Sequence, residues 1–153
     1  MVNVNAGTLN VSNAFTQAGT LQVGGGGATF SKAGGFTNNG NVTGSGTVDV
    51  TGGTLTNSGT IRPDGGGLDA TGTLNVTGNF VQTSTGVLDF QAEGTAAGTF
   101  DRLAISGTAA LAGTMRLNTA SGFTPSANQN FDLLTYLSSS GAFTTIEIGR
   151  AHV

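Results

Sequence analysis

The sequence predicts an all-β protein, namely a single-stranded, right-handed parallel β-helix (β-solenoid) with coils of about 18–26 residues. Apolar residues alternate with Thr, Asn and Ser along most of the 153 residues, which is the period of a pleated strand. One pattern recurs about every 20 residues, as stacked repeats do. Gly, Asn and Ser gather between the alternating segments, where a coil would turn its corners. No window carries a helical stripe, so essentially no helix is expected.

The repeat unit is clearest at residues 72–88. Gly-Thr is followed there by Leu74 and Val76, a short glycine turn, Phe80, a polar corner and a new strand. The same order of residues is found, with some variation, in three earlier segments: Gly7–Leu21, Gly27–Val42 and Gly46–Ile61.

The internal spacing of the repeat indicates stacked coils. The large apolar residues of successive units follow one another at intervals of 19–25 residues: Phe15, Phe36, Leu55 and Phe80. The strand before each begins at a nearly constant distance upstream, at Leu9, Phe30, Val48 and Leu74. Hairpins would repeat at shorter intervals. We therefore expect each coil to pair in parallel with the next, about 4.8 Å away, through right-handed crossovers.

The composition fits the corners of such coils. Glycine pairs and runs allow positive φ without a Cβ clash, at Gly24–Gly27, Gly34-Gly35, Gly52-Gly53 and Gly65–Gly67. Asn tolerates the same backbone region, and stacked Asn side chains can hydrogen-bond along the axis. We expect these roles at Asn38, Asn39, Asn57 and Asn79.

The pattern divides the chain into three parts. Residues 1–97 are predicted to form the repeat coils. Residues 98–146 are more apolar and poorer in glycine, and they are predicted to form the closing, cap-like coils. A turn is expected near Ser126–Gln129, beside Pro125, whose ring presets φ.

Residues 98–146 also carry a specific resemblance. Phe100-Asp-Arg-Leu-Ala-Ile-Ser-Gly107 leads through alternating Gly-Thr strands to Leu117, followed by Gly122-Phe-Thr-Pro and Phe131-Asp-Leu-Leu-Thr-Tyr136. This order resembles the C-terminal part of autotransporter-type passengers, which are bacterial surface adhesins. The repeats at 7–91 resemble autotransporter-associated β-strand repeats. Asn128 replaces the Gly that is frequent in the family, and Asn can adopt the left-handed conformation that the turn needs.

The third part is the C-terminal segment Glu147-Ile-Gly-Arg-Ala-His-Val153, which breaks the pattern. It resembles the translation of a sequencing adaptor, which predicts that 147–153 is a non-native tail. The alternating start at Met1 likewise predicts that residue 1 lies inside a coil and that the rest of the native chain is missing.

Composition argues against several classes of function. Only 8% of the residues are charged, and the net charge of −3 is unsuited to nucleic acid, whose phosphates require a basic surface. The five basic residues are scattered singly: Lys32, Arg62, Arg102, Arg116 and Arg150. There is no Cys, and hence no disulfide framework. No apolar run is long enough to span a membrane as a helix.

No residue qualifies as a catalytic, metal-binding or cofactor-binding site. The single His, His152, has no acid or nucleophile at a useful spacing. Asp64-Gly-Gly-Gly-Leu-Asp69 departs from the calcium-binding nonapeptide because Leu68 stands where Gly is required. The carboxylates, Asp49 and Asp89 in particular, are expected on the solvated outer face, without a cluster of Asp, Lys or Arg in a groove. They are Asp49, Asp64, Asp69, Asp89, Glu93, Asp101 and Asp132.

Three further motifs are weak. Gly24–Gly27 lacks the Gly-Lys-Ser/Thr ending of a phosphate loop. Asn10, Asn41 and Asn75 begin glycosylation sequons, which chance produces in a polar chain. An ice-binding ladder of Thr-x-Thr would need regular spacing, whereas these motifs are unevenly spaced: Thr54/Thr56, Thr71/Thr73 and Thr83/Thr85.

The expected function, which the resemblance implies, is structural and adhesive rather than enzymatic: a passenger stalk that is extracellular or at the bacterial cell surface, associated with the outer membrane. Its expected partners are surface glycans or proteins, bound by avidity and without a cofactor. The alternatives are a polysaccharide-degrading β-helix enzyme, an ice-binding solenoid, and self-association through the exposed end coils.

Overall fold

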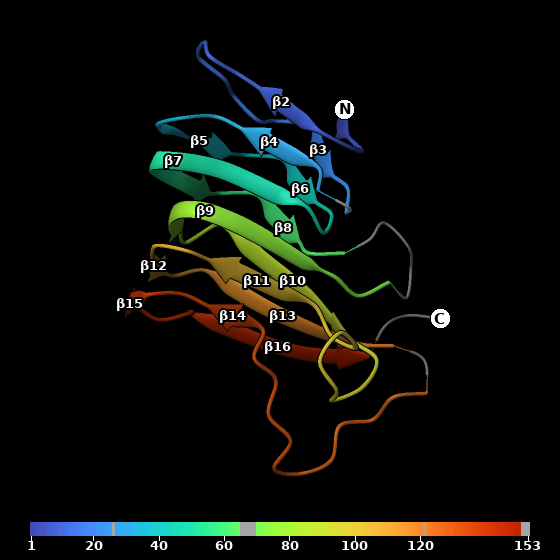
Figure 1. Cartoon of the computed structure of the whole chain (residues 1–153). Helices are drawn as coiled ribbons and strands as arrows, with labels where there is room; N and C mark the ends of the chain where they lie inside the picture. The colour runs from blue at the N-terminus through green and yellow to red at the C-terminus, as the bar shows by residue number, and fades with distance from the viewer. Residues whose placement is uncertain (26, 65–69, 121, 151–153) are drawn as a thin grey trace.

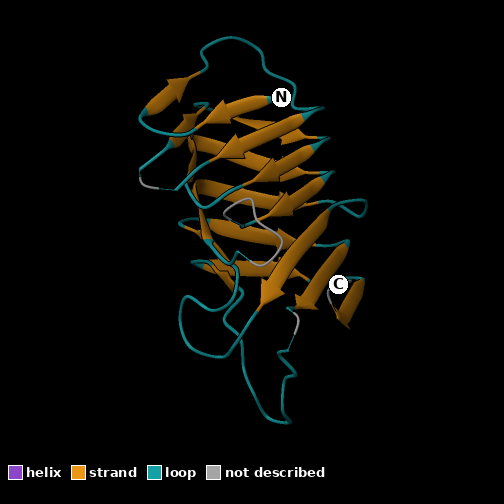
Figure 2. Ribbon diagram, turned by 90° about the vertical axis from the view of Figure 1, so that its right-hand side faces the viewer, coloured by secondary structure: helices purple, strands orange, loops and turns teal. Residues whose placement is uncertain are grey.

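The computed structural model describes residues 1–25, 27–64, 70–120 and 122–150. These residues form 16 strands and no helix, and the chain winds as a right-handed parallel β-helix (Figure 1), which confirms the predicted fold class. Each coil contributes strand segments to three flat faces, named here A, B and C. Figure 2 shows the strands of successive coils stacked above one another.

Face A is a continuous parallel sheet with one strand from every coil, and its strands are the third segment of each turn. They are β1 (Val2–Val4), β3 (Thr20–Val23), β6 (Asn41–Thr43), β8 (Thr60–Arg62), β10 (Val87–Ala92), β13 (Thr114–Thr119) and β16 (Thr145–Arg150).

Faces B and C share one sheet that bends at a corner, because β7 and β9 run through both faces. Face B contains β2 (Thr8–Asn10), β4 (Thr29–Ser31), the first parts of β7 (Thr47–Asn57) and β9 (Thr73–Gln82), β11 (Arg102–Ile105) and β14 (Leu134–Thr135). Face C contains β5 (Gly35–Asn38), the second parts of β7 and β9, β12 (Thr108–Leu111) and β15 (Ser138–Gly141).

The inward side chains form one column per face and together make a continuous apolar core. Stacking leaves each of the column residues named below at most 7% exposed, because inward side chains of neighbouring coils cover it. The columns are Leu21–Val42–Ile61–Leu88 on face A, Phe30–Val48–Val76–Ile105 on face B and Phe36–Leu55–Phe80–Ala109 on face C.

Two details of the predicted repeat are wrong. Val48 pairs with Val76 rather than with Leu74, because β7 has extra residues between Asp49 and Thr54 that disturb the register against β9. The predicted coil length holds for the early coils, in which Thr8 pairs with Thr29. Later coils exceed it, as the pairing of Thr73 with Arg102 shows, because loops between faces A and B lengthen.

A buried polar column runs along the corner between faces C and A. The Asn38 Nδ2 donates to Asn57 Oδ1, and the Asn57 Nδ2 donates to Gln82 Oε1, each at 2.8 Å. Gln17, in the coil before, bridges to Asn38 through the backbone. This confirms the predicted axial stacking of Asn38 and Asn57.

The same Asn residues do not take positive φ as predicted. Among the described residues other than Gly, only Asn128 does so, at 69°. Asn38 and Asn57 lie in strands and use their amides in the column instead. The predicted turn near Ser126–Gln129 is confirmed by the bond from Gln129 N to Ser126 O.

Candidate functional site

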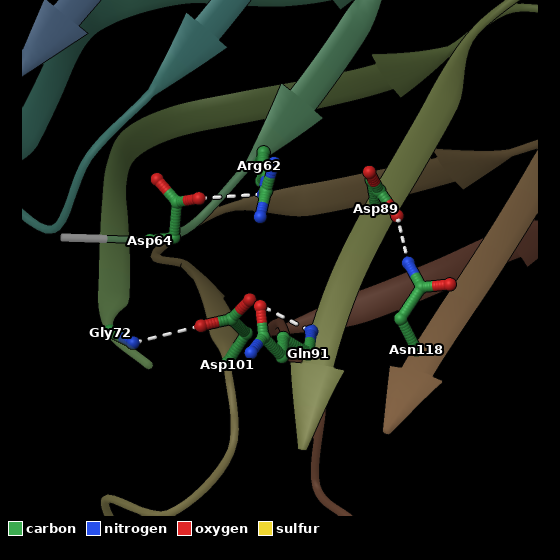
Figure 3. A network of polar contacts seen from close by, with 7 residues as sticks. All are labelled: Arg62, Asp64, Gly72, Asp89, Gln91, Asp101 and Asn118. Carbon is green, nitrogen blue, oxygen red and sulfur yellow. Dashed lines mark hydrogen bonds and ion pairs between the residues drawn. The ribbon is translucent and has the colours of Figure 1, made fainter. Parts of the chain in front are cut away.

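The corner between faces A and B carries the longest connections of the solenoid. Short turns join the two faces in the first coils, whereas residues 63–72, 93–101 and 120–133 connect them in the later coils. Three charged side chains lie near one another at the first two of these connections: Arg62, Asp64 and Asp101 (Figure 3).

Arg62 and Asp64 form an ion pair at the end of β8. The Arg62 Nε lies 2.6 Å from the Asp64 Oδ2, and the Asp64 amide donates to the Arg62 carbonyl at 2.9 Å. Asp64 is buried at 4% exposure, whereas the Arg62 side chain reaches solvent. The positive charge of Arg62 therefore offsets part of the desolvation cost of burying the Asp64 carboxylate.

Asp101 precedes β11 and has no solvent exposure. Its Oδ1 accepts from the Gly72 amide and its Oδ2 accepts from the Gln91 amide, both at 2.8 Å (Figure 3). The Asp101 amide also donates to the Gln91 carbonyl at 2.8 Å. This one side chain thus joins the end of β10, the segment that enters β9, and the start of β11.

Burial raises the pKa of Asp101 from its ordinary value of 3.8 to about 7. The amide donors Gly72 and Gln91 oppose this shift because they stabilise the carboxylate. The charge of Asp64 adds to the rise, and Arg62 opposes it. The carboxyl therefore changes its protonation state near neutral pH.

The outer-face expectation for the carboxylates is wrong for Asp64 and Asp101, which are both buried. Both carboxylates lie in or beside the long connections, which the strand period does not describe, so alternation could not place them. The signal that was available is the length of the A-to-B connections, since longer connections can cover the corner and bury polar groups.

The other described carboxylates agree better with the prediction. Asp49 alternates with the buried Val48 and Val50, and its bond to the Thr51 hydroxyl lowers its pKa. Asp89 accepts from Asn118 Nδ2 at 2.7 Å on the outer side of face A. The exposed carboxylates in loops are Glu93 and Asp132.

Face A aligns charges that are far apart in the sequence. Asp89 pairs in register with Arg116, and Arg116 with Glu147. The Arg116 Nε lies 2.8 Å from the Glu147 Oε2, and this bond raises the pKa of Arg116. Both side chains are well exposed, so the ion pair contributes only about 0–1 kcal/mol to the free energy of unfolding. The spacing of the basic residues in the sequence suggested that Arg116 is isolated, but the structure gives it acidic neighbours on both sides.

A shallow groove lies on the outer side of face C, with a volume of about 380 Å³. It crosses β7, β9, β12 and β15, so it follows the axis of the solenoid. Its lining is uncharged and rich in hydroxyl groups: Thr54, Asn79, Phe80, Val81, Thr108, Ala109, Ala110 and Ser138–Ser140. No sequence motif marked this groove, because its residues come from successive coils that are far apart in the sequence.

The remaining candidate residues are dispersed. His152, Asp69 and the glycines at 65–67 lie outside the described residues. Thr54 and Thr56 lie on face C, Thr73 starts face B, and Thr83 and Thr85 lie in the connection to face A. The three sequon residues, Asn10, Asn41 and Asn75, are exposed.

Over the described ranges, no three His, Cys, Asp or Glu side chains are grouped as metal ligands would be. In the same part of the chain, no helix is long and apolar enough to cross a membrane. No known protein family, curated protein or solved structure matches the chain.

Proposed function

We propose that the chain is a structural and adhesive segment of a secreted or cell-surface bacterial protein, similar to an autotransporter passenger stalk. The observation that carries the proposal is the continuous apolar core inside three polar faces. Each coil stabilises its neighbours through backbone pairing, so the structure extends in one dimension and holds its surface away from an anchor.

The outer faces suit weak, repeated contacts. Their exposed positions are mostly Thr, Ser and Asn, which offer hydroxyl and amide groups at every coil. A single such contact is weak, but many copies displayed together on one surface bind by avidity. The absence of Cys from the sequence is compatible with this role, because parallel pairing and packing supply the stability.

Beads coated with the chain provide a direct test. We expect attachment to bacterial or host cells to rise steeply with coating density, since avidity requires several simultaneous contacts. Beads coated with a heat-denatured sample at equal density serve as the control. Attachment that is absent at every density, or equal for the denatured sample, would contradict the proposal.

The cluster of Arg62, Asp64 and Asp101 favours one alternative, a polysaccharide-degrading enzyme. Two neighbouring carboxyl groups, one of them with a raised pKa, are typical of glycoside hydrolysis. Asp101, however, is completely buried, and each of its carboxylate oxygens already accepts a hydrogen bond from a backbone amide. Both observations favour a structural role for Asp101. Release of reducing ends or unsaturated products from a polysaccharide panel, abolished by Asp101→Asn, would establish the enzyme.

A further inference from the structure

The groove on face C has a repeating chemical pattern along its length. Thr54 pairs in register with Asn79, and Thr108 with Ser138. Asn79 and Thr108 join the two pairs, because the Thr108 hydroxyl donates to Asn79 Oδ1 at 3.1 Å. One column of polar side chains therefore offers a hydrogen-bonding group at each coil, about every 4.8 Å.

A parallel column of small side chains, of which Val81 and Ala110 are apolar, lies two residues along each strand. Val81 pairs with Ala110, and Ala110 with Ser140, so the groove presents methyl groups beside the hydroxyls. A sugar ring has the same two kinds of surface, with hydroxyls at its edge and C–H groups on its faces. The coil spacing is also close to the rise of one pyranose in an extended β-linked chain.

We propose that this groove binds an extended, uncharged polysaccharide whose chain runs along the solenoid axis. The inference rests on the proposed adhesive function and names the ligand class and the place where it binds. The volume of about 380 Å³ falls within the range of ligand sites, and the groove crosses strands of successive coils, namely β7, β9, β12 and β15.

Charge and backbone pairing favour this ligand over the alternatives. No lining residue is charged, so an acidic glycan or a nucleic acid would find no cation there. Among the described strands that line the groove, β15 pairs only with β12 and leaves one edge unpaired. That edge lies across the groove, so an extended peptide added to it would follow the strand and not the groove.

The side chain of Asn79 is held in place for such a role. Its Oδ1 accepts from both the amide and the hydroxyl of Thr108, at 3.0 and 3.1 Å. Its Nδ2 has no acceptor in the part of the chain that the structure describes, and Asn79 is exposed. A fixed donor next to methyl groups is a suitable partner for a sugar hydroxyl.

The test is an NMR titration of the whole chain with cellohexaose and laminarihexaose, and with hexagalacturonate as the charged comparison. We expect saturable shifts at Thr54, Asn79 and Ala110 with a neutral hexasaccharide, at a Kd on the order of 1 mM. Hexagalacturonate is expected to bind at least about tenfold more weakly. Failure of every neutral hexasaccharide to shift these residues would overturn the proposal.

Ala110→Ile fills the groove with a residue that suits a strand, and Ala104→Ile is its matched control on face B of the same coil. Both positions are half-buried and face outward. We expect Ala110→Ile to weaken binding at least about tenfold and Ala104→Ile to leave it unchanged. Thr54→Val, which removes one hydroxyl at constant shape, is expected to weaken binding several-fold even if Ala110→Ile fails to fold. Equal binding by the Thr54→Val variant and the parent chain would contradict the assigned site.

The bead assay separates the two proposals. If beads carrying the parent chain and Ala110→Ile attach equally well, adhesion stands and the groove is not its site. If the parent chain attaches to no cell but still binds neutral hexasaccharides at the groove, the adhesive function fails and the ligand assignment stands.

Discussion

Asp101 combines complete burial with two amide donors from different coils. Its carboxyl holds a proton in the folded protein up to a pH of about 7, whereas an unfolded Asp has an ordinary pKa of 3.8. Between these values the folded state binds more protons than the unfolded state. The contribution of Asp101 to stability is therefore fully present below pH 4 and is lost as the pH rises through 7.

We expect the free energy of unfolding to fall by up to about 4 kcal/mol between pH 4 and pH 8 from this group alone. Asp101→Asn removes the titration, so its stability should change less over that range. Urea unfolding at several pH values measures the difference. Asp132→Asn, which removes an exposed carboxylate, is the control, and a slope unchanged in Asp101→Asn would contradict the assignment.

The buried amides of the polar column are a second feature at this scale. Asn57 donates to Gln82 and accepts from Asn38, so it serves two neighbours at once. Gln82 ends the column: its Nε2 is buried without a partner among the described residues. The next coil has Leu111 where the column would continue, two residues beyond Ala109, and Leu offers no acceptor.

Asn57→Ala is expected to lower the free energy of unfolding by about 2–4 kcal/mol, because it leaves an acceptor on Gln82 and a donor on Asn38 poorly satisfied. Asn39→Ala changes an exposed Asn one residue from the column and should cost less than about 0.5 kcal/mol. Thermal or urea unfolding compares the two. Equal losses would show that the column adds nothing specific.

At the scale of elements, the corners decide which coil positions require glycine. Gly44 has φ +116°, and a Cβ there would overlap the Val23 carbonyl oxygen of the preceding coil. Gly7 stands at the same A-to-B corner with φ +66°, and a Cβ there would meet nothing within 4 Å. Both corners need positive φ, but only Gly44 is also closely packed against a neighbouring coil.

We therefore expect Gly44→Ala to cost more than about 3 kcal/mol, through strain and displacement of the Val23 peptide. Gly7→Ala should cost only about 1 kcal/mol, from the left-handed conformation. Circular dichroism during chemical unfolding gives both values. If Gly7→Ala were as damaging as Gly44→Ala, backbone conformation rather than packing between coils would explain the effect.

At the scale of the whole molecule, the last described coil leaves inward positions uncovered. Ile146 pairs with Met115 and Ile148 with Leu117, so both continue core columns. They are nevertheless 61% and 74% exposed, and Leu137 is 80% exposed. Unpaired strand edges beside apolar side chains promote association between chains.

Sedimentation velocity at several concentrations should therefore show association that grows with concentration. Ile146→Lys places a charge on the open end and should shift the chain toward monomer. Thr60→Lys, in the middle of face A, is the control and should leave association unchanged. A monomer at all concentrations would contradict self-association through this end.

Alternation and repeat spacing were sufficient to predict the architecture and most of the core. Leu21, Val42 and Ile61 are buried because the strand period and the coil period both place them inward. The axial stacking of Asn38 and Asn57 and the left-handed turn at Asn128 followed from side-chain and backbone chemistry that is local. These features depend on residues close in sequence or one coil apart.

What the sequence by itself determined is thus the parallel coil, its apolar columns and its glycine corners, since each follows from a short-range period. Only the tertiary structure decided the register of Val48 with Val76, the burial of Asp64 and Asp101, and the groove through Thr54, Asn79, Thr108 and Ser138. These three features depend on the extra residues in individual corners and loops, which shift one coil relative to the next. The repeat period of the sequence carries no information about such unequal lengths.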